Sequence, residues 1–308
     1  MDLQLDQLRA LDAAVAEGTL EAAARRLSVT PSAVSQRIKA LEGTVGRILL
    51  QRTKPVRPTE SGLSVLRLAR QIDLLTGDTA RELGTAAAES DTAASAGSRP
   101  VRIPIAVNAD SLETWAMPAL GRGPAGVCFE IHREDEEHTT RLLRDGTVMA
   151  AITSTAHPVQ GCRVRRLGTM RYRPMATPEF ARAWFPDGAT ARAFAQAPVV
   201  MFDRKDDLQD RLMRRRTRRP VDPPRHYIPA TSGYAEAVRL GMGWGLLPDL
   251  QIATSPYARE LVGIDSLGEH VDGLHVDVSL YWQQWRLDSQ ALTAVAEAVA
   301  ATAAASLR

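Results

Sequence analysis

The sequence predicts an α/β protein in which a helical N-terminal unit precedes a larger unit of alternating strands and helices. Three observations support this fold class. The chain has 308 residues, which suits two or three compact domains of about 100–150 residues each. Apolar residues recur at helical spacing in the first part of the chain. From Val101 onward, short apolar runs typical of strands alternate with helical segments.

Three helices are predicted near the N-terminus, at residues 3–17, 20–27 and 31–43. Thr19 is placed to cap the second helix, and Thr30 to cap the third, which begins with Pro31. The third helix has an apolar face and a face of small polar, amide and cationic side chains. Two short helices joined by a tight turn, the second with such a face, are typical of a helix-turn-helix.

A wing is predicted after the third helix, because residues 46–58 (GRILLQRTKPVRP) join an apolar strand-like piece to a basic loop bounded by proline. Side chains of the third helix are candidates for contacts to bases, and cations of the helix and wing are candidates for contacts to phosphates. The candidate DNA-binding residues are Thr30, Ser32, Ser35, Gln36, Arg37, Lys39, Arg52, Lys54 and Arg57. The alternative is the solvated face of an ordinary surface helix.

The charge of the chain is unevenly distributed. The formal net charge of +2 argues by itself against nucleic-acid binding. Residues 25–57, however, hold eight Lys and Arg side chains and the single acid Glu42, a local balance of +7 that leaves −5 for the rest. The helix-turn-helix and wing therefore form a basic segment suited to phosphate contacts.

A long helix is predicted from Thr59 to about Ala88, with an apolar stripe that requires a partner helix. Residues 89–100 (ESDTAASAGSRP) have the composition of a hinge. The predicted organisation is thus residues 1–58 for DNA binding, 59–88 as linker and dimerisation helix, 89–100 as hinge, and 101–308 as a second domain.

Strands and helices alternate through the second domain, which predicts a largely parallel sheet with ligands at the carboxyl ends of its strands. A closing helix is predicted at residues 289–305. The predicted strands are residues 101–107, 127–133, 148–153, 198–202, 246–248 and 276–282.

Composition excludes several other classes of protein. Hydrophobic residues make up 44 % of the chain and charged residues 24 %, as in globular proteins. Cys128 and Cys162 are too few for a disulfide framework and lack the spacing of metal ligands. No apolar run reaches about 18 residues, and the N-terminus lacks the layout of a signal peptide. We therefore expect a cytoplasmic protein without metal or cofactor.

The chain resembles the LysR-type transcriptional regulators over essentially its whole length. The resemblance rests on LDQLRALDAAVAEGTLEAAARRLSVTPSAVSQRIKALE, on QRTKPVRPTESG and on GMGWGLLP. It implies a winged helix-turn-helix, a dimerising linker helix and an effector domain like a periplasmic binding protein. The two subdomains would be residues 101–163 with 268–308, and 164–267. Such regulators commonly form tetramers of two compact and two extended subunits.

Four further segments resemble the branch of this family that senses basic amino acids and controls an exporter gene. They are NADSLETW at 108–115, EDE at 134–136, FDRKDD at 202–207 and SLYWQQW at 279–285. The resemblance implies that L-lysine or L-arginine, with L-histidine as a further candidate, activates transcription of the exporter gene. DNA, a second copy of the chain and RNA polymerase are the implied partners.

The effector residues are expected where strands end and helices begin. A helix start near Asn108 and Ser111, with Asp110 and Glu113 at the spacing of a capping box, would hold an α-carboxylate. A plain helix cap is the alternative. Carboxylates from both subdomains would hold the cationic side chain, unless the acidic run is merely a solvated face. The candidate effector-binding residues are Asn108, Ser111, Glu134, Asp135, Thr153, Ser154, Phe202, Asp203, Ser232 and Gly233.

Other features favour structural explanations. Trp115 and Trp282 are expected in the core or the pocket wall, and Cys128 in a buried strand. The arginine run at 214–219 is interpreted as a solvated surface loop rather than a second DNA contact. No base is paired with a nucleophile in any recognisable pattern, so we expect no enzyme. Two alternatives remain: an architectural, replication-inhibitor-like DNA-binding protein, and a LysR-type regulator with another effector.

Overall fold

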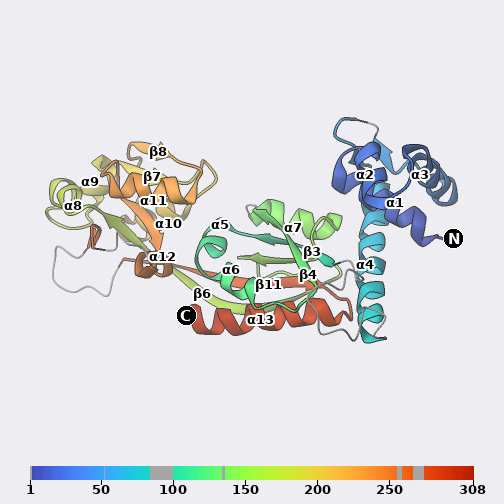
Figure 1. Cartoon of the computed structure of the whole chain (residues 1–308). Helices are drawn as coiled ribbons and strands as arrows, with labels where there is room; N and C mark the ends of the chain where they lie inside the picture. Colours follow the sequence, from blue (N-terminus) through green and yellow to red (C-terminus); the bar gives the residue numbers. More distant parts are fainter. Residues whose placement is uncertain (1, 52, 84–99, 134–135, 255–258, 266–273) are drawn as a thin grey trace.

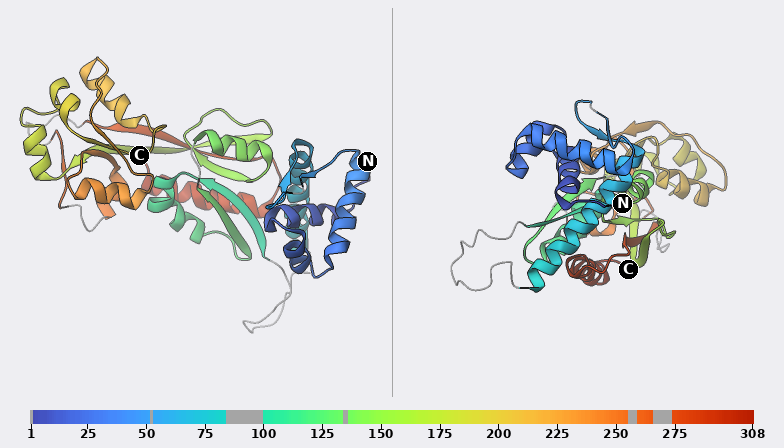
Figure 2. Two further views of the ribbon diagram at one scale, coloured as in Figure 1. Left: turned by 90° about the horizontal axis from the view of Figure 1, so that it is seen from above. Right: turned by 90° about the vertical axis from the view of Figure 1, so that its right-hand side faces the viewer.

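The protein is an elongated row of three parts, of which one long helix joins the first two. The structure is a computed structural model that describes residues 2–51, 53–83, 100–133, 136–254, 259–265 and 274–308. Figure 1 shows the N-terminal domain, which we call the head, the helix α4 beneath it, and the two lobes of the C-terminal domain. Seen from above, the head, lobe I and lobe II follow one another along the molecule (Figure 2).

The head is the predicted winged helix-turn-helix. It consists of α1 (Leu5–Glu17), α2 (Leu20–Leu27), α3 (Pro31–Val45), β1 (Leu50–Gln51) and β2 (Arg57–Pro58). The hydroxyl of Thr19 accepts a hydrogen bond from the Ala22 amide at 3.1 Å, and that of Thr30 accepts one from the Ala33 amide at 3.2 Å. Both predicted helix caps are therefore present, because each hydroxyl satisfies an amide that the first turn leaves free.

The wing is held against the helices by specific bonds. Its strands pair antiparallel, and the Glu42 carboxylate of α3 accepts a hydrogen bond from the Leu49 amide at 2.8 Å. The Val56 amide donates to the carbonyl of Gly18 at 2.8 Å, which ties the wing to the turn between α1 and α2. The position of the wing beside α3 is thus fixed by contacts from two sides.

The linker helix α4 (Glu60–Glu82) joins the head to lobe I. Gly62 lies against the backbone of Leu49, where a Cβ atom would meet the Leu49 carbonyl oxygen. Leu66 packs in the core of the head, whereas Leu74, two turns later, belongs to the core of the C-terminal domain. The predicted helix extended to Ala88, but residues 84–88 and most of the predicted hinge lie outside the described residues.

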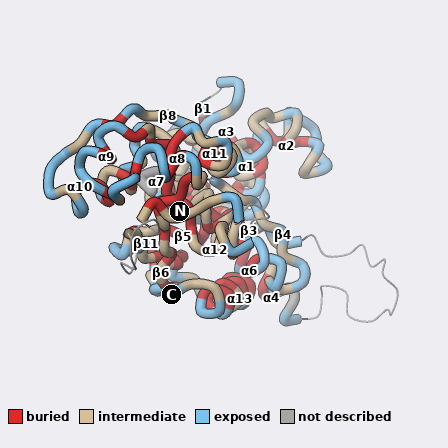
Figure 3. Tube along the Cα trace, turned by 90° about the vertical axis from the view of Figure 1, so that its left-hand side faces the viewer, coloured by how far each residue is buried: buried red, intermediate tan, exposed pale blue. Residues whose placement is uncertain are grey.

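Lobe I is built on a sheet with helices on both faces, and Figure 1 shows α13 along one face and α7 on the other. Its elements are β3 (Val101–Val107), α5 (Ala109–Ser111), a π-helical turn (Leu112–Ala116), α6 (Met117–Gly121), β4 (Val127–Arg133), α7 (Glu136–Asp145), β5 (Ala150–Thr153), the first part of β6 (Cys162–Ala176), β11 (Val276–Trp285) and α13 (Gln290–Ser306). The fully buried residues gather in the interior of the molecule (Figure 3), among them Trp115 and Trp282, as predicted.

Lobe II shares the sheet through the second part of β6. Its elements are α8 (Pro178–Trp184), α9 (Ala191–Gln196), β7 (Val199–Met201), α10 (Leu208–Thr217), β8 (Arg225–Tyr227), α11 (Thr231–Arg239), β9 (Gly245–Pro248), α12 (Asp249–Thr254) and β10 (Val262–Gly263). β6 pairs with β11 as far as Tyr172, and from Tyr172 to Met175 it pairs with β9. One strand therefore runs from lobe I into lobe II.

The prediction of a largely parallel sheet was wrong. The order is β10-β6-β11-β5-β3-β4, with β9 also on β6. Within this seven-stranded sheet β3, β4 and β5 run parallel, while β6, β9, β10 and β11 join antiparallel. A separate two-stranded sheet in lobe II pairs β7 with β8 in parallel. The sequence reasoning missed β6 because its pattern CRVRRLGTMRYRPMA places arginines among the apolar positions.

Two smaller predictions were also wrong. Cys128 is exposed rather than buried, because β4 lies at the edge of the sheet. The arginine run at 214–219 begins in the last turn of α10 and continues past the helix end, instead of forming a surface loop throughout. Cations in the last turn of a helix face its negative dipole end. This favourable placement at the end of α10 is a structural explanation for Arg214, Arg215 and Arg216.

Candidate functional sites

The exposed face of α3 carries most of the predicted DNA-binding residues. Ser32, Gln36 and Lys39 are exposed, and Val34 and Ile38 on the other face are buried in the core of the head. A helix with one buried face and one polar, cationic face is able to enter the major groove.

Three of the candidates, Thr30, Ser32 and Arg37, already have partners within the head. The hydroxyl of Thr30, besides capping α3, lies 3.0 Å from that of Ser32. The guanidinium of Arg37 donates to the Asp6 carboxylate at 3.2 Å, in a pair whose side chains are 31 % and 63 % exposed. Exposed ion pairs contribute little to stability. Arg37 can therefore exchange Asp6 for a phosphate at small cost, whereas Thr30 has a structural role.

The wing lies beside the polar face of α3. Lys54 and Arg57 are exposed, and Lys54 and Ser35 line a cavity of about 170 Å³ between the wing and α3. Arg52 lies outside the described residues. The described wing cations thus extend the polar face of α3.

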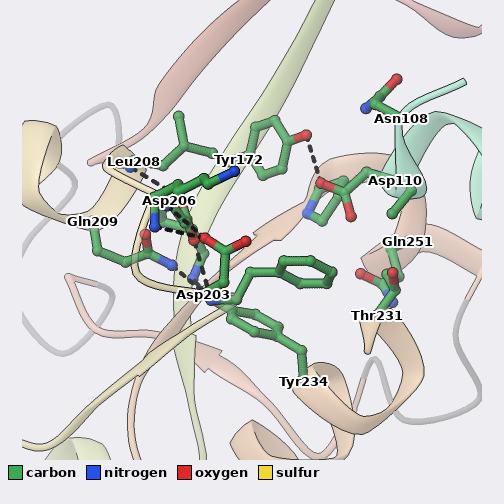
Figure 4. A pocket seen from close by; sticks show the side chains of 15 residues that line it. Asn108, Asp110, Tyr172, Asp203, Asp206, Leu208, Gln209, Thr231, Tyr234 and Gln251 are labelled. Atoms are coloured by element: carbon green, nitrogen blue, oxygen red, sulfur yellow. Dashed lines mark hydrogen bonds between the residues drawn. The ribbon is translucent and has the colours of Figure 1, made fainter. Parts of the chain in front are cut away.

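A larger cavity of about 450 Å³ lies between the two lobes (Figure 4). It is lined by Asn108, Ala109, Asp110, Tyr172, Phe202, Asp203, Lys205, Asp206, Leu208, Gln209, Thr231, Tyr234, Leu246, Pro248 and Gln251. Residues 108–110 follow β3 in lobe I, and residues 202–209 follow β7 in lobe II. Three of the predicted effector residues, Asn108, Phe202 and Asp203, are in this lining.

Asp110 is the acidic group that lobe I brings to the cavity. Its carboxylate accepts a hydrogen bond from the Tyr172 hydroxyl at 2.7 Å. Burial raises the pKa of Asp110, the hydrogen bond from Tyr172 opposes that rise, and the negative charge of Asp206 adds to it. The capping-box interpretation of Asp110 was wrong, because Asn108 occupies the cap position and Asp110 lies inside the short helix.

Lobe II contributes two carboxylates from the loop after β7. Asp206 accepts hydrogen bonds from the amides of Phe202 at 3.2 Å and Leu208 at 3.1 Å. Burial raises its pKa, although these backbone bonds favour the charged form. Asp203 accepts from the amides of Lys205 at 2.7 Å and Asp206 at 2.9 Å. Figure 4 shows Asp110 on one side of the pocket and the two lobe II carboxylates on the other.

Three buried polar oxygens of the lining lack a hydrogen-bond partner among the described residues: Asn108 Oδ1, Gln209 Oε1 and Thr231 Oγ1. The amide nitrogen of Gln209 donates to the Tyr234 hydroxyl at 2.9 Å, which orients the Gln209 side chain. Buried polar atoms are nearly always hydrogen-bonded in native proteins. These three oxygens are therefore free to accept hydrogen bonds from water or from a polar ligand in the cavity.

Five other predicted effector residues do not line this cavity: Ser111, Thr153, Ser154, Ser232 and Gly233. Ser111 and Thr153 are buried, and the Thr153 hydroxyl accepts from the Thr155 amide at 3.1 Å. Ser232 is exposed, since α11 begins one residue earlier and places Thr231 at the cavity. Glu134 and Asp135 lie outside the described residues.

The sequence reasoning missed most of the lining. Asp206 lies in the segment FDRKDD at 202–207, and its spacing from Asp203 was the only feature of the sequence that could have indicated a role in the cavity. Tyr172, Gln209, Tyr234 and Gln251 gave none, because they reach the cavity from β6, α10, α11 and α12. Within the described ranges, no cluster of at least three possible metal ligands occurs, and no helix has the length and apolar character to span a bilayer.

Comparisons with known proteins assign the head and the C-terminal domain to one protein family. Residues 5–63 match the model of bacterial regulatory helix-turn-helix proteins of the lysR family, and residues 101–304 match the LysR substrate binding domain. The chain is 45 % identical over 305 residues to the HTH-type transcriptional regulator LysG of Mycobacterium tuberculosis, covering 98 % of this chain and 95 % of that protein. It is 40 % identical to the lysine export transcriptional regulatory protein LysG of Corynebacterium glutamicum, covering 99 % of each. Full-length LysG of C. glutamicum with bound effector Arg has a TM-score of 0.70 at 38 % identity, with 99 % of each chain covered.

Proposed function

The chain belongs to the lysR family of bacterial transcriptional regulators, and from this membership we propose where it binds DNA and what it senses. It binds an operator in double-stranded DNA through α3 and the wing. It senses a basic amino acid in the cavity between the lobes. The candidate ligands are L-lysine and L-arginine, followed by L-histidine. In response it activates transcription of a basic amino-acid exporter gene.

One observation carries the choice of ligand: Asp110 from lobe I and Asp206 from lobe II are half-buried carboxylates, each with a pKa raised by burial, that face the same cavity. A buried carboxylate is costly unless a cation or hydrogen bonds compensate it. The cationic end of lysine or arginine supplies that compensation to both lobes at once. The unpartnered oxygens of Asn108, Gln209 and Thr231 are suited to accept hydrogen bonds from the ligand's ammonium or guanidinium donors.

The relatives support the same ligand class. One carries lysine export in its name, and the C. glutamicum protein was solved with arginine as its effector. The remaining partners follow from the same role: a second copy of the chain through α4, further assembly to a homotetramer, and RNA polymerase at the promoter. The protein acts in the cytoplasm as a regulator and not as an enzyme.

Calorimetric titration tests the ligand proposal. L-Arginine and L-lysine are compared with L-citrulline, which has nearly the shape of arginine without its charge. We expect binding of arginine or lysine, and binding of citrulline weaker by about 10–100-fold, since a hydrogen bond to a charged group contributes about 1.5–3 kcal/mol. Equal binding of citrulline, or binding of an unrelated effector alone, would refute the proposal. No ligand effect with strong binding to A·T-rich DNA would instead favour the architectural alternative.

The DNA-binding residues are tested by two matched substitutions on the same surface. Lys54→Ala is expected to weaken binding to all sequences alike and to reduce the slope of log K against log salt by about 1. Gln36→Ala is expected to relax the preference for one base, at a cost of about 1–3 kcal/mol. If both variants bound like the unaltered protein, the proposed reading face would be wrong.

A further inference from the structure

The cavity between the lobes is lined by charges of both signs. The acidic residues of its lining are Asp110, Asp203 and Asp206. Of the described residues that line the cavity, Lys205 is the one with a positive charge. A basic amino acid has the complementary pattern, because it carries two cationic groups and a single α-carboxylate. The acidic residues match the cationic groups of such a ligand, and Lys205 matches its carboxylate.

Lys205 lies in the loop between β7 and α10, and the backbone of this loop is held by the loop's own side chains. The Asp203 carboxylate accepts hydrogen bonds from the amides of Lys205 at 2.7 Å and Asp206 at 2.9 Å. The Asp206 carboxylate accepts from the amides of Phe202 at 3.2 Å and Leu208 at 3.1 Å. The backbone of Lys205 is therefore already ordered at the cavity, which lowers the entropy that a ligand must supply on binding.

The lobe I side of the cavity is poorly suited to a carboxylate. From the sequence we expected the α-carboxylate at the helix start near Asn108 and Ser111. Ser111, however, is outside the cavity lining. The carboxylate of Asp110 lies in the same short turn and faces the cavity. An α-carboxylate bound there would be repelled by a like charge.

Two neutral donors of the lining are already used within the protein. The amide nitrogen of Gln209 donates to the Tyr234 hydroxyl at 2.9 Å and to a backbone carbonyl at 3.2 Å. The Tyr172 hydroxyl donates to the Asp110 carboxylate at 2.7 Å. A carboxylate removed from water requires a cation or strong hydrogen bonds. The Lys205 ammonium supplies both, since it is a positive charge with several N–H donors.

We propose that Lys205 binds the α-carboxylate of the ligand and so makes the cavity selective for basic amino acids over their decarboxylation products. This inference rests on the proposed function and specifies which part of the ligand is recognised. Agmatine and cadaverine keep the two cationic groups of arginine and lysine but lack the carboxylate. Either compound meets the Lys205 ammonium as a like charge. The protein therefore senses the amino acid and not the amine formed from it.

Calorimetry on the full chain tests this proposal by changing the protein and the ligand together. L-Arginine and agmatine are titrated into the parent protein and into Lys205→Met, whose side chain has similar length without charge. We expect the parent to bind arginine about 10–100-fold more tightly than agmatine, as for a hydrogen bond between charged groups. In Lys205→Met, arginine should weaken by about the same factor. Agmatine should bind at least as tightly as before, so the preference falls toward one.

Arg204→Met is the matched control. Arg204 is the exposed neighbour of Lys205, is outside the cavity lining, and lies over the ring of Tyr227, 4.7 Å from its centroid. This variant should keep the preference of the parent for arginine. Lys205→Arg retains the positive charge and is expected to prefer arginine more strongly than Lys205→Met does.

The possible results separate the role of Lys205 from the proposed function. Equal affinities of the parent for arginine and agmatine would overturn the role of Lys205. Equal weakening of both ligands in Lys205→Met would overturn it too, because that result indicates a disturbed loop and not a lost contact to the carboxylate. An unchanged preference in Lys205→Met contradicts Lys205 alone. If the parent bound neither arginine nor lysine, the proposed function itself would be wrong.

Discussion

At the scale of single residues, the cavity contains carboxylates that are unfavourable without a ligand. Asp110 and Asp206 both have raised pKa values because they are buried. The described residues around Asp110 supply one hydrogen bond, from Tyr172, at 2.7 Å. The free protein therefore holds carboxyl groups whose charge a cationic ligand would stabilise.

Asp110→Asn is expected to raise the stability of the ligand-free protein at neutral pH. A carboxyl whose pKa is raised on folding costs stability as pH rises from its ordinary value of 3.8 through the raised pKa, and the full cost is present above that. The amide removes this cost and still accepts the bond from Tyr172. The melting temperature should rise by at least about 2 °C at pH 7.5, and the gain should shrink as pH falls.

The same variant should bind arginine about 10–100-fold more weakly, because the amide carries no charge. Glu179→Gln, which neutralises an exposed carboxyl of α8, is the control for both measurements. A melting temperature that falls in Asp110→Asn, or an unchanged affinity for arginine, would contradict this account of the cavity.

At the scale of elements, α4 connects two cores. Its beginning packs on the wing through Gly62, and Leu74 enters the C-terminal domain. It also exposes Leu68 and Leu75, and Leu83 directly after its end is exposed as well, at 37 %, 36 % and 70 % accessibility. These leucines recur at spacings of seven and eight residues and so lie along one side of the helix.

Gly62→Ala is expected to destabilise the head by about 1–3 kcal/mol or more, because the added Cβ meets the backbone of Leu49. Gly43→Ala is the matched control in α3, where a Cβ has open space. It should stabilise its helix by about 0.5–1 kcal/mol. Denaturant unfolding of the full chain measures both, and equal effects would show that the contact with Leu49 is unimportant.

Leu75→Glu is expected to weaken self-association, because it places a charge within the exposed leucine stripe of α4. Leu75→Met keeps the apolar surface and serves as the control. Sedimentation velocity at several concentrations measures the change. If Leu75→Glu remained as associated as the parent protein, α4 would not be the dimerisation surface.

At the scale of the whole molecule, two lobes share one sheet and face each other across the cavity. β6 pairs with β11 in lobe I and with β9 beyond Tyr172, so this strand carries the chain between the lobes. A ligand that binds Asp110 and Asp206 together contacts both lobes. Its binding energy therefore favours the closed arrangement.

Arginine is expected to reduce the radius of gyration measured by small-angle X-ray scattering. The physical reason is closure of lobe II on lobe I around the bound cation. Citrulline at the same concentration, and arginine with Asp110→Asn, should leave the radius unchanged. A radius that stays constant under saturating arginine would exclude lobe closure as the response.

Local signals predicted the head well. Local sequence patterns reveal the caps at Thr19 and Thr30, the proline at the start of α3 and the apolar spacing, because each depends on residues close together in the chain. No such pattern predicted the strand β6, because its arginines interrupt the apolar alternation. The antiparallel pairing of β6 and β11 joins segments about 100 residues apart, which no local pattern reports.

The helix-turn-helix, the basic character of the head and the alternation of strands and helices that follows could all be derived from the order of residues alone. The set of polar groups that share a cavity, and the hydrogen bonds that Arg70 of α4 donates to the turn after α7, emerged only from the folded arrangement. Tyr172 and Asp110 are 62 residues apart, and Arg70 and Gly146 are 76 apart. Such contacts depend on the register of strands and the packing of α4, whereas caps and periodicity depend on neighbours in the chain.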